Sequence, residues 1–529
     1  MKFNIKLLAR QPASASQRIA KNTGILYAKM GITMFISLYT TRLVLNALGA
    51  SDFGIFGLVG GAIGMLSFLE SAMASATQRF MSYAEGEGDK EKQKTVFNVS
   101  VILHILIAIV VAVMLIIAGF FFFDGGFKLN ILPERVFAAR IIYYFVIAST
   151  LFTIITVPYD AVLNAHENML YYAIVGIIES LLKLTVAIIV VNTMADKLIV
   201  YGALTAGITF VVMMVMRIYC HRKYEECVFK PKVYFNKKSM KEMTGFAGWN
   251  FLGSSFVIIS GNGSNIIINH FFGTLLNSVV ALAGQFNGLL LSFANTMIKT
   301  LNPVIVKREG SGNREAMLSA ATSGCKISFF LFAFFALPFL IETPYILNLW
   351  LKNDVPEWTI TFCRLAIVQT LIEIMVMPLG TCVSAVGKIK QLNIRQSIKA
   401  IVEIGFLFGG FLFGMPPYWY SIVATLSVSA NSIIIIQQTA KFGNLDVKKF
   451  VGGVVFKLFG IFVFSFLMIY NITWLNESFF RLLTTCLFSS VTFLLLFYFM
   501  ALDSEEKKMI KNMYHTIYKN VFSNHTIIQ

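Results

Sequence analysis

Charged side chains within apolar stretches are the residues of this sequence best placed to do chemistry. Lysine and arginine bind anionic groups such as phosphate, and a carboxylate in apolar surroundings can take up a proton or a metal cation. The clearest case is Glu179 and Lys183, which lie four residues apart in one apolar run and therefore share a helical face. Two interpretations remain open, because such a pair either neutralises itself inside a helix bundle or faces a water-filled cavity.

Three further cations lie in or beside apolar runs. Lys29 is near the start of one run and is able to extend its ammonium to the interface, whereas Arg42 lies toward the far end and requires a partner. Arg79 marks the end of a run, where an interfacial position is an alternative to ligand binding. Together with Lys183, these residues are the candidate cations of a binding site for an anionic substrate.

Carboxylates and amides complete the set of candidates. Glu70, Glu179 and Glu373 lie in apolar runs and are candidates for coupling to an ion, either H+ or Na+. Asn250 and Asn265 belong to a polar stripe with helical spacing between residues 245 and 270. Amides in such a stripe either hold neighbouring helices together or bind the hydroxyl groups of a sugar, and both interpretations remain open.

Membrane-spanning helices must position these residues. The 529 residues are 57% hydrophobic and 13% charged, which is too apolar for a soluble protein. A run of roughly 20 apolar residues can span a bilayer, and about fourteen such runs predict an all-α polytopic membrane protein. The runs cover residues 24–48, 53–79, 95–122, 137–162, 169–192, 198–219, 245–270, 274–300, 316–341, 359–385, 394–414, 418–440, 449–470 and 480–502.

The net charge is +17 at pH 7, and the lysines and arginines are distributed unevenly between the two sets of loops. Roughly 33 of the 44 lysines and arginines fall in the tails and loops of one side, and about five fall on the other side. The positive-inside rule therefore predicts a multi-pass protein with both termini in the cytoplasm. The same sorting argues against nucleic acid as a partner, because nucleic acid would require one basic face.

No enzyme or cofactor signature accompanies the charges. The sequence contains no Walker A sequence, no GxSxG, no HExxH and no cluster with metal-ligand spacing. The six cysteines show no CxxC spacing, so free thiols are expected. The sequence predicts a protein that is not an enzyme and that uses neither a cofactor nor a bound metal.

The chain carries a long internal repeat. Three pairs of landmarks define it: Gly49 and Gly273, Glu85–Asp89 (EGEGD) and Glu309–Asn313 (EGSGN), both 224 positions apart, and Pro158 and Pro378, 220 positions apart. A repeat of six helices predicts two bundles related by an axis along the membrane normal.

The repeat predicts two pseudo-symmetric six-helix bundles plus two extra C-terminal helices. The expected parts are an N-terminal lobe at 1–217, a basic cytoplasmic linker at 218–244, a C-terminal lobe at 245–441, two helices at 442–502 and a cytoplasmic tail at 503–529. Ile266 stands in the second copy where the first copy has Arg42. A cationic cavity between the lobes would therefore be asymmetric, with the anion held by the N-terminal lobe.

Several short motifs lie between residues 42 and 89: Arg42, Leu48-Gly49, Phe53-Gly54, ATQRF at Ala76–Phe80 and EGEGD. This stretch resembles the first two helices of bacterial Wzx-type polysaccharide flippases. Two further segments, Pro158–Ala165 and Asn302–Ala316, resemble the junctions of helices 4 and 5 and of helices 8 and 9 in that family. The family belongs to the multidrug/oligosaccharidyl-lipid/polysaccharide (MOP) exporter superfamily.

The resemblance implies a flippase of the bacterial inner membrane. Such a protein moves an undecaprenyl-diphosphate-linked oligosaccharide, an O-antigen or capsule-type repeat unit, from the cytoplasmic to the periplasmic leaflet by alternating access. The implied partners are this substrate, membrane lipids and a coupling ion, and a monomer is expected. The expected binding residues are four cations for the diphosphate and two amides for the glycan: Lys29, Arg42, Arg79, Lys183, Asn250 and Asn265.

Two alternatives remain. A cation-coupled multidrug exporter of the same fold would have an acidic, aromatic cavity. A membrane-embedded glycan ligase or polymerase would need acid, base or sugar-binding residues on long external loops, whereas the expected outer loops are short.

Overall fold

A computed structural model describes residues 15–64, 67–123, 131–351, 355–474, 476–504, 506–508 and 511. Over these residues the regular structure is helical, and no strand is present among them. The all-α fold class predicted from the sequence is confirmed. The first fourteen residues and most of the expected tail at 503–529 lie outside the described residues.

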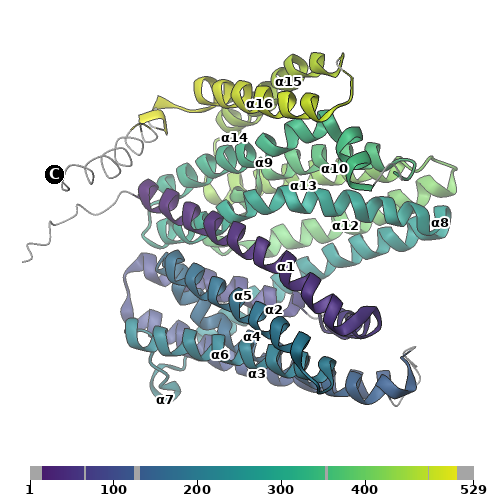
Figure 1. The fold of residues 1–529 in the computed structure, drawn as a ribbon. Helices are drawn as coiled ribbons and strands as arrows, with labels where there is room; N and C mark the ends of the chain where they lie inside the picture. Colours follow the sequence, from purple (N-terminus) through teal and green to yellow (C-terminus); the bar gives the residue numbers. More distant parts are fainter. Residues whose placement is uncertain are drawn as a thin grey trace, which may run out of the picture.

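The first bundle contains six long helices. Their bounds are α1 (Ala15–Gly64), α2 (Ser67–Glu87), α3 (Lys90–Phe123), α4 (Val136–Ala165), α5 (Met169–Asn192) and α6 (Lys197–Lys223). A linker carrying the single turn α7 (Pro231–Tyr234) leads to the second bundle. Figure 1 shows α2 to α6 as one layer of the molecule, with α1 running along the boundary between the bundles.

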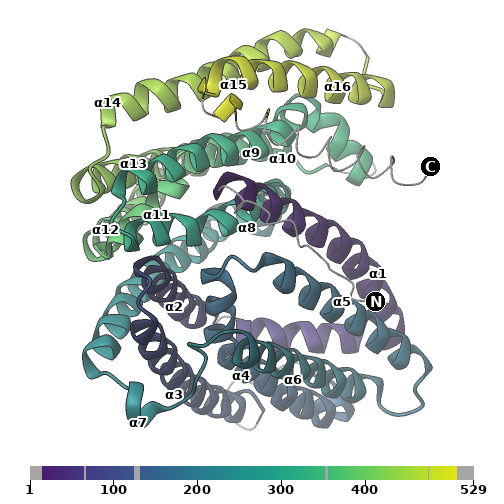
Figure 2. The same cartoon turned by 90° about the vertical axis from the view of Figure 1, so that its left-hand side faces the viewer.

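The second bundle begins with α8, the longest helix among the described residues. Its helices are α8 (Lys237–Gly310), α9 (Arg314–Leu351), α10 (Thr359–Ile374), α11 (Met377–Val386), α12 (Ile389–Leu412) and α13 (Trp419–Gly443). The chain then continues through α14 (Val447–Phe450), α15 (Phe456–Tyr470) and α16 (Phe479–Leu496). In Figures 1 and 2 these last helices lie along the outer side of the second bundle, on the face away from the first.

Eleven helices among the described residues are long and apolar enough to cross a membrane. Two of the helices, α1 and α8, continue through non-helical residues at Gly49 and Gly273. Division of α8 at Gly273 adds a span, the second half of α1 with α2 forms another, and the 24-residue helix α12 is a further one. The described helices therefore account for about fourteen spans, as the sequence predicted.

Residues with positive φ recur in the two bundles at the repeat offsets. Gly49 and Gly273 have φ values of 76° and 75°, and both join two helices of a hairpin. Two further pairs match in the same way: Gly88 and Gly312 (φ 72° and 77°), and Glu167 and Gly387 (φ 55° and 83°). Because side chains disfavour this region of backbone space, three matched pairs show that the repeat is one of backbone path as well as sequence.

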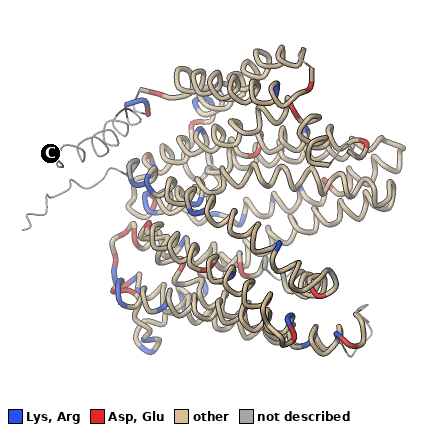
Figure 3. Tube along the Cα trace, viewed as in Figure 1, with Lys and Arg blue, Asp and Glu red and all other residues tan. Residues whose placement is uncertain are grey.

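Charges gather at one end of the molecule, which we call the basic end. Figure 3 shows most lysines and arginines of the described residues at the left-hand end of the bundles, where acidic residues also occur. This end contains the starts of α3 and α8 and the junction of α8 with α9, including Lys90, Lys237 and Arg314. The middle of both bundles is largely free of charge in the same view.

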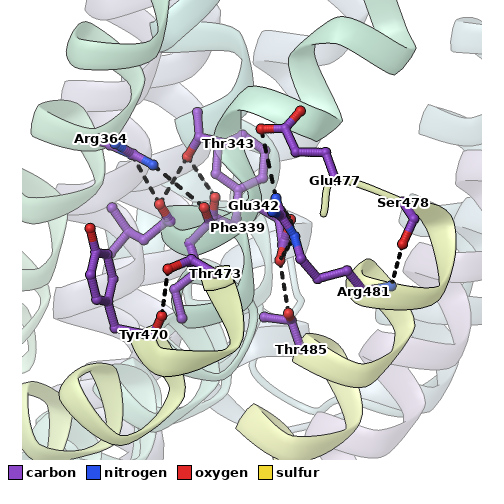
Figure 4. A network of polar contacts seen from close by, with 12 residues as sticks. Phe339, Glu342, Thr343, Arg364, Tyr470, Thr473, Glu477, Ser478, Arg481 and Thr485 are labelled. Carbon is purple, nitrogen blue, oxygen red and sulfur yellow. Dashed lines mark hydrogen bonds and ion pairs between the residues drawn. The ribbon is translucent and has the colours of Figure 1, made fainter. Parts of the chain in front are cut away.

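Ion pairs attach the start of α16 and the segment that follows it to α9, and Figure 4 shows those at the start of α16. Arg481 at the start of α16 donates to both oxygens of Glu342, with Nη2 2.7 Å from Oε2, and Glu342 is completely buried. The hydroxyl of Thr485 donates to the same carboxylate at 2.8 Å. At the basic end, Lys326 of α9 bonds Glu506 at 2.8 Å. A buried ion pair of this kind is strongly destabilising when one partner is removed, so α16 is held firmly against α9.

Candidate functional site

A polar cavity opens inside the first bundle. Its volume is about 180 Å³, and α1, α4, α5 and α6 supply its walls. Its lining combines charged, aromatic and hydroxyl side chains, including Lys29, Asp160, Tyr172, Glu179, Thr156 and Thr209. Ionisable residues are costly at this depth of a membrane protein and mark a functional site by default.

Lys29 reaches this cavity from α1. The helix begins at Ala15 rather than near residue 24, so Lys29 lies about 20 Å along it, at 1.5 Å per residue. Its Nζ lies 4.1 Å from the centre of the Tyr172 ring. Gly176 makes room for it, because a Cβ at this position would lie 2.3 Å from the Lys29 Cε. Lys29 therefore turns into the bundle rather than toward the interface.

Lys299 approaches the same ring from the other bundle. Its Nζ lies 3.8 Å from the centre of the Tyr172 ring, and Lys299 belongs to the second half of α8. Within the described part of the chain, neither Lys29 nor Lys299 forms an ion pair. Two ammonium groups thus share one aromatic ring, an arrangement in which each cation–π contact contributes about 1–2 kcal/mol when desolvated.

Carboxylates accompany the two lysines. Asp160 and Glu179 line the cavity, and Asp160 interacts electrostatically with Lys299, Lys29 and the other predicted carboxylate of this bundle, Glu70. The site can therefore bind an anion through its lysines, or a proton or cation through its carboxylates. No group of three or more His, Cys, Asp or Glu side chains in the described residues is arranged to hold a metal ion.

Lys183 lies beside this cavity rather than in it. Its Nζ bonds the Glu179 Oε1 at 2.6 Å, and its side chain is 47% exposed. The corresponding pair in the second bundle, Lys399 and Glu403, is 3.3 Å apart. Each pair therefore neutralises itself along its own helix, as four-residue spacing allows.

Arg42 and Asn265 are apart from the cavity. Both are exposed, and neither is among the cavity-lining residues. Glu373 lies in α10 of the second bundle, where the charge acting on it comes from Lys399. The structure therefore does not bring these three predicted residues to the cavity that contains Lys29.

Arg79 and Asn250 join the bundles instead. The Arg79 guanidinium donates to the carbonyls of Ser384 at 2.7 Å and Ala385 at 2.9 Å, which end α11. Asn250 of α8 donates to the hydroxyl of Ser75 at 3.3 Å. Both residues connect α2 with the second bundle in this conformation, so their groups hold the bundles together at and near the basic end.

The backbones of α2 and α8 touch at the basic end. A Cβ on Gly86 would lie 2.2 Å from the Lys307 carbonyl oxygen, and one on Gly310 would lie 2.3 Å from the Tyr83 carbonyl oxygen. The offset of 224 relates these two contacts, so they are pseudo-symmetric. Lys307 also bonds Glu167 at 3.0 Å. We call these contacts and those of Arg79 the inter-bundle contact, and they close the basic end.

A titratable cluster supports Glu167 from within the first bundle. His166 follows α4 and lies between Glu226, which it bonds through Nε2, and Glu85, 3.3 Å from Nδ1. Burial opposes the charge on His166, but hydrogen bonds with the two carboxylates outweigh it and raise its pKa to about 9. Burial likewise opposes the charge on both glutamates, and their hydrogen bonds with His166 outweigh it, so the pKa values of Glu85 and Glu226 are lowered.

The candidate residues from the sequence did not include Asp160 and Tyr172, which line the cavity, or Lys299, which contacts the Tyr172 ring. The apolar run at 137–162 contains Asp160 near its end, and α4 continues to Ala165, so Asp160 lies within the helix. Lys299 lies at the end of the apolar run at 274–300, and its contact with Tyr172 joins positions 127 residues apart. Only the three-dimensional arrangement brings these groups together.

The sequence also matches known proteins. A family model described as "Polysaccharide biosynthesis protein" matches residues 19–309, more than half of the chain. The uncharacterized membrane protein EpsK of Bacillus subtilis (strain 168) is 22% identical over 307 residues. That match covers 57% of this chain and 59% of EpsK, so the chain spans about three fifths of the length of this relative.

Solved structures share the fold. A MATE transporter in a bent conformation superposes with a TM-score of 0.70 at 16% identity, over 82% of this chain and 96% of that chain. An outward-facing multidrug resistance MATE family transporter of the MOP superfamily gives a TM-score of 0.67, also at 16% identity and the same coverage. A MOP superfamily transporter from Pyrococcus furiosus gives 0.64 at 16% identity, over 83% and 99%. At these identities the likeness concerns the fold alone.

Proposed function

The chain belongs to the polysaccharide biosynthesis protein family, and from this premise we propose that it moves an undecaprenyl-diphosphate-linked oligosaccharide across the inner membrane. The direction is from the cytoplasmic to the periplasmic leaflet. The carrying observation is the convergence of Lys29 and Lys299 on Tyr172, because a diphosphate is the group of this substrate that needs two cations.

In this proposal the diphosphate binds between the two lysines. Lys29 comes from α1 and Lys299 from α8, so both contact the anion only while the bundles approach each other at this depth. The cavity of about 180 Å³ has room for a small polar group, so the glycan occupies the space between the bundles and the lipid tail stays in the bilayer. Asn265 and the other exposed amides of α8 are the proposed glycan contacts.

Alternating access follows from the inter-bundle contact. With the basic end in the cytoplasm, the described conformation is closed toward the cytoplasm. A flippase would adopt this state after it has released its substrate into the periplasmic leaflet. Opening requires Arg79 to leave the α11 carbonyls and Lys307 to leave Glu167. The substrate diphosphate would then enter and accept charge-assisted hydrogen bonds from Lys29 and Lys299.

The carboxylates of the cavity provide a route for ion coupling. Protonation of Asp160 or Glu179 removes negative charge beside Lys29 and strengthens its attraction for an anion. Loss of that proton would weaken binding and favour release of the anion. The charge of Glu70 in α2 also acts on Asp160, whereas Glu373 would be the proton-binding or cation-binding carboxylate of the second bundle.

Transport by the purified protein in liposomes tests the proposal. A lectin added outside would report an undecaprenyl-diphosphate-linked oligosaccharide that has crossed the bilayer. The expected result is protein-dependent appearance of the diphosphate-linked glycan and much slower appearance of its monophosphate-linked analogue. Equal rates for the two lipids, or no acceleration over empty liposomes, would contradict the assigned substrate.

A cation-coupled drug exporter is the second candidate. Asp160, Glu179 and Tyr172 in one cavity are the observation that favours it, because acidic and aromatic groups bind lipophilic cations. Expression in a drug-sensitive bacterium distinguishes the candidates. Increased resistance to cationic dyes that is lost in Asp160→Asn would support the exporter, and unchanged resistance would exclude it.

A further inference from the structure

A second pocket lies on the seam between the two bundles. It has a volume of about 320 Å³ and is lined almost entirely by apolar side chains. Residues of α2 and α3 form one wall, and residues 244–251 of α8 form the other. On its rim, Leu106 and Val110 are 45% and 52% exposed, so the pocket opens at the surface of the bundles, where lipid would surround them.

Two lysines extend the pocket-lining face of α8 to the basic end. Thr244, Gly248 and Phe251 line the pocket. Lys237 and Lys241 precede them at intervals of four and three residues, and this alternation continues to Phe251 and keeps all five on one helical face. This face of α8 therefore carries positive charge at Lys237 and Lys241, and its pocket-lining part follows further along the helix.

These two lysines are not neutralised by neighbouring carboxylates. Both are exposed, and neither forms an ion pair with any residue in the described ranges. On the opposite wall, Lys92 at the start of α3 is paired with Glu87 at 2.6 Å. Lys237 and Lys241 therefore offer unpaired positive charge on the helical face that lines the pocket.

The dimensions match those of one leaflet of a bilayer. From Lys241 to Phe251 the helix rises about 15 Å, which is roughly half of a 30 Å hydrocarbon core. In Figures 1 and 2 the adjoining turn α7 lies at the rim of the first bundle at the basic end. Asn98 of α3 fixes the linker there, since it donates to the Val228 carbonyl and accepts from the Lys230 N–H, both at 2.8 Å.

We propose that this seam binds an anionic glycerophospholipid of the leaflet at the basic end. The phosphate contacts Lys237 and Lys241, and one acyl chain fills the apolar pocket. Positive charge attracts anionic headgroups near a membrane surface, and the pocket lining offers an acyl chain apolar contact on both walls. The lipid contacts both bundles at their seam and is a resident ligand rather than the transported substrate, so the site is independent of the proposed function.

Native mass spectrometry of the full-length protein tests the site, with phosphatidylglycerol and phosphatidylcholine as probes. The wild-type protein is expected to retain phosphatidylglycerol in preference to phosphatidylcholine. Lys237→Gln/Lys241→Gln should weaken that retention about thirtyfold, from roughly fivefold per lysine. The control Lys448→Gln/Lys449→Gln removes two exposed lysines of α14 and should change retention less than twofold.

A second variant tests the pocket without changing charge. A Cβ at Gly248 would meet no atom within 4 Å, so Gly248→Leu can fill the pocket without a backbone clash. It should lower phosphatidylglycerol retention while Lys237 and Lys241 remain. Retention unchanged in both the lysine and the Gly248 variants would overturn the site. Displacement of phosphatidylglycerol by undecaprenyl diphosphate at equal concentration would assign the seam to the transported lipid and overturn the resident-lipid proposal.

Discussion

The two bundles follow one backbone plan but place charge differently. With the offset of 224 residues, Lys29 corresponds to Gly253, and with the offset of 220, Asp160 and Tyr172 correspond to Gly380 and Leu392. The second bundle therefore lacks all three groups at the positions equivalent to the cavity. The matched positive-φ residues keep the hairpins alike, so the difference lies in side chains and not in the path of the chain.

Packing closes the equivalent place in the second bundle. A Cβ on Gly253 would lie 2.5 Å from Oδ1 of Asn393, so this glycine allows α12 to approach α8 closely. In the first bundle the equivalent helix carries a lysine, and Gly176 opposite it makes room. Glycine therefore has two different roles in the two copies of the repeat. Gly176 makes room for the charged side chain of Lys29, whereas Gly253 replaces that lysine and allows the helices to pack closely.

The strongest test of this asymmetry removes the lysines of the first site. Lys29→Gln and Lys299→Gln should each reduce transport of the lipid-linked oligosaccharide about 10- to 100-fold, because charge-assisted hydrogen bonds to phosphate are lost. The liposome assay with a lectin measures this. Lys183→Gln is the matched control, since Lys183 is exposed and paired, and it should stay within a few-fold of wild type. Equal losses of transport in all three variants would contradict the assignment of Lys29 and Lys299, but not Lys183, to the binding site.

The second test separates the bundles where they touch. Gly86→Val places a side chain against the Lys307 backbone and should move the bundles apart at the basic end, at a cost of about 1–3 kcal/mol if they stay together. Distances between spin labels on α3 and α9 report the change. Gly245→Val is the control, because a Cβ there meets no atom within 4 Å. Unchanged distances would show that α2 and α8 accommodate the side chain without opening.

The third test addresses the closed counterpart in the second bundle. Gly253→Ala should lower the free energy of unfolding by about 1 kcal/mol, because Asn393 must shift. Gly261→Ala, whose Cβ would meet no atom within 4 Å, should not destabilise the protein. Thermal unfolding in detergent compares the two. Equal stability of both variants would mean that the second bundle has unused space at this position.

The smallest effect concerns pH. Since the pKa of His166 is raised to about 9 from an ordinary 6.5, its stabilisation is complete below pH 6.5 and is lost as the pH rises through about 9. The lowered pKa values of Glu85 and Glu226 mean that their contribution is present above pH 4.5 and is lost at lower pH. The melting temperature should therefore fall by about 2–4 °C between pH 7 and pH 10.

His166→Gln should abolish that alkaline loss. The equivalent position in the second bundle is Val386, which does not titrate. Hydrogen exchange should accordingly increase at residues 163–169 above pH 9 and stay constant at residues 383–389. An increase at both places would contradict a titration confined to the first bundle.

The sequence predicted the features that depend on local or periodic order. The membrane-spanning fold, the family and the repeat are confirmed, and the four-residue pair Glu179 and Lys183 does form a bond. Local spacing determines such pairs, and repeat offsets determine the hinge glycines Gly49 and Gly273. The domain boundaries and the binding roles of the candidate residues stay predictions.

Long-range pairing could not be predicted in the same way. Arg79 contacts carbonyls about 300 positions away, and no local pattern distinguishes that contact from an interfacial arginine. Lys299 and Tyr172 come from different bundles, so their meeting depends on the angle between the bundles. The start of α1 at Ala15 decided the depth of Lys29, and helix ends are the least certain part of any periodicity argument.

The pairing of Glu342 with Arg481 also sets conditions for biosynthesis. The carboxylate of α9 leaves the ribosome 139 residues before the guanidinium that neutralises it, so every shorter nascent chain inserts an uncompensated acid into the bilayer. Arrival of α16 ends that state. A chain truncated after α13 would keep every group of the proposed transport site and still be expected to reach membrane proteases before it reaches a stable fold.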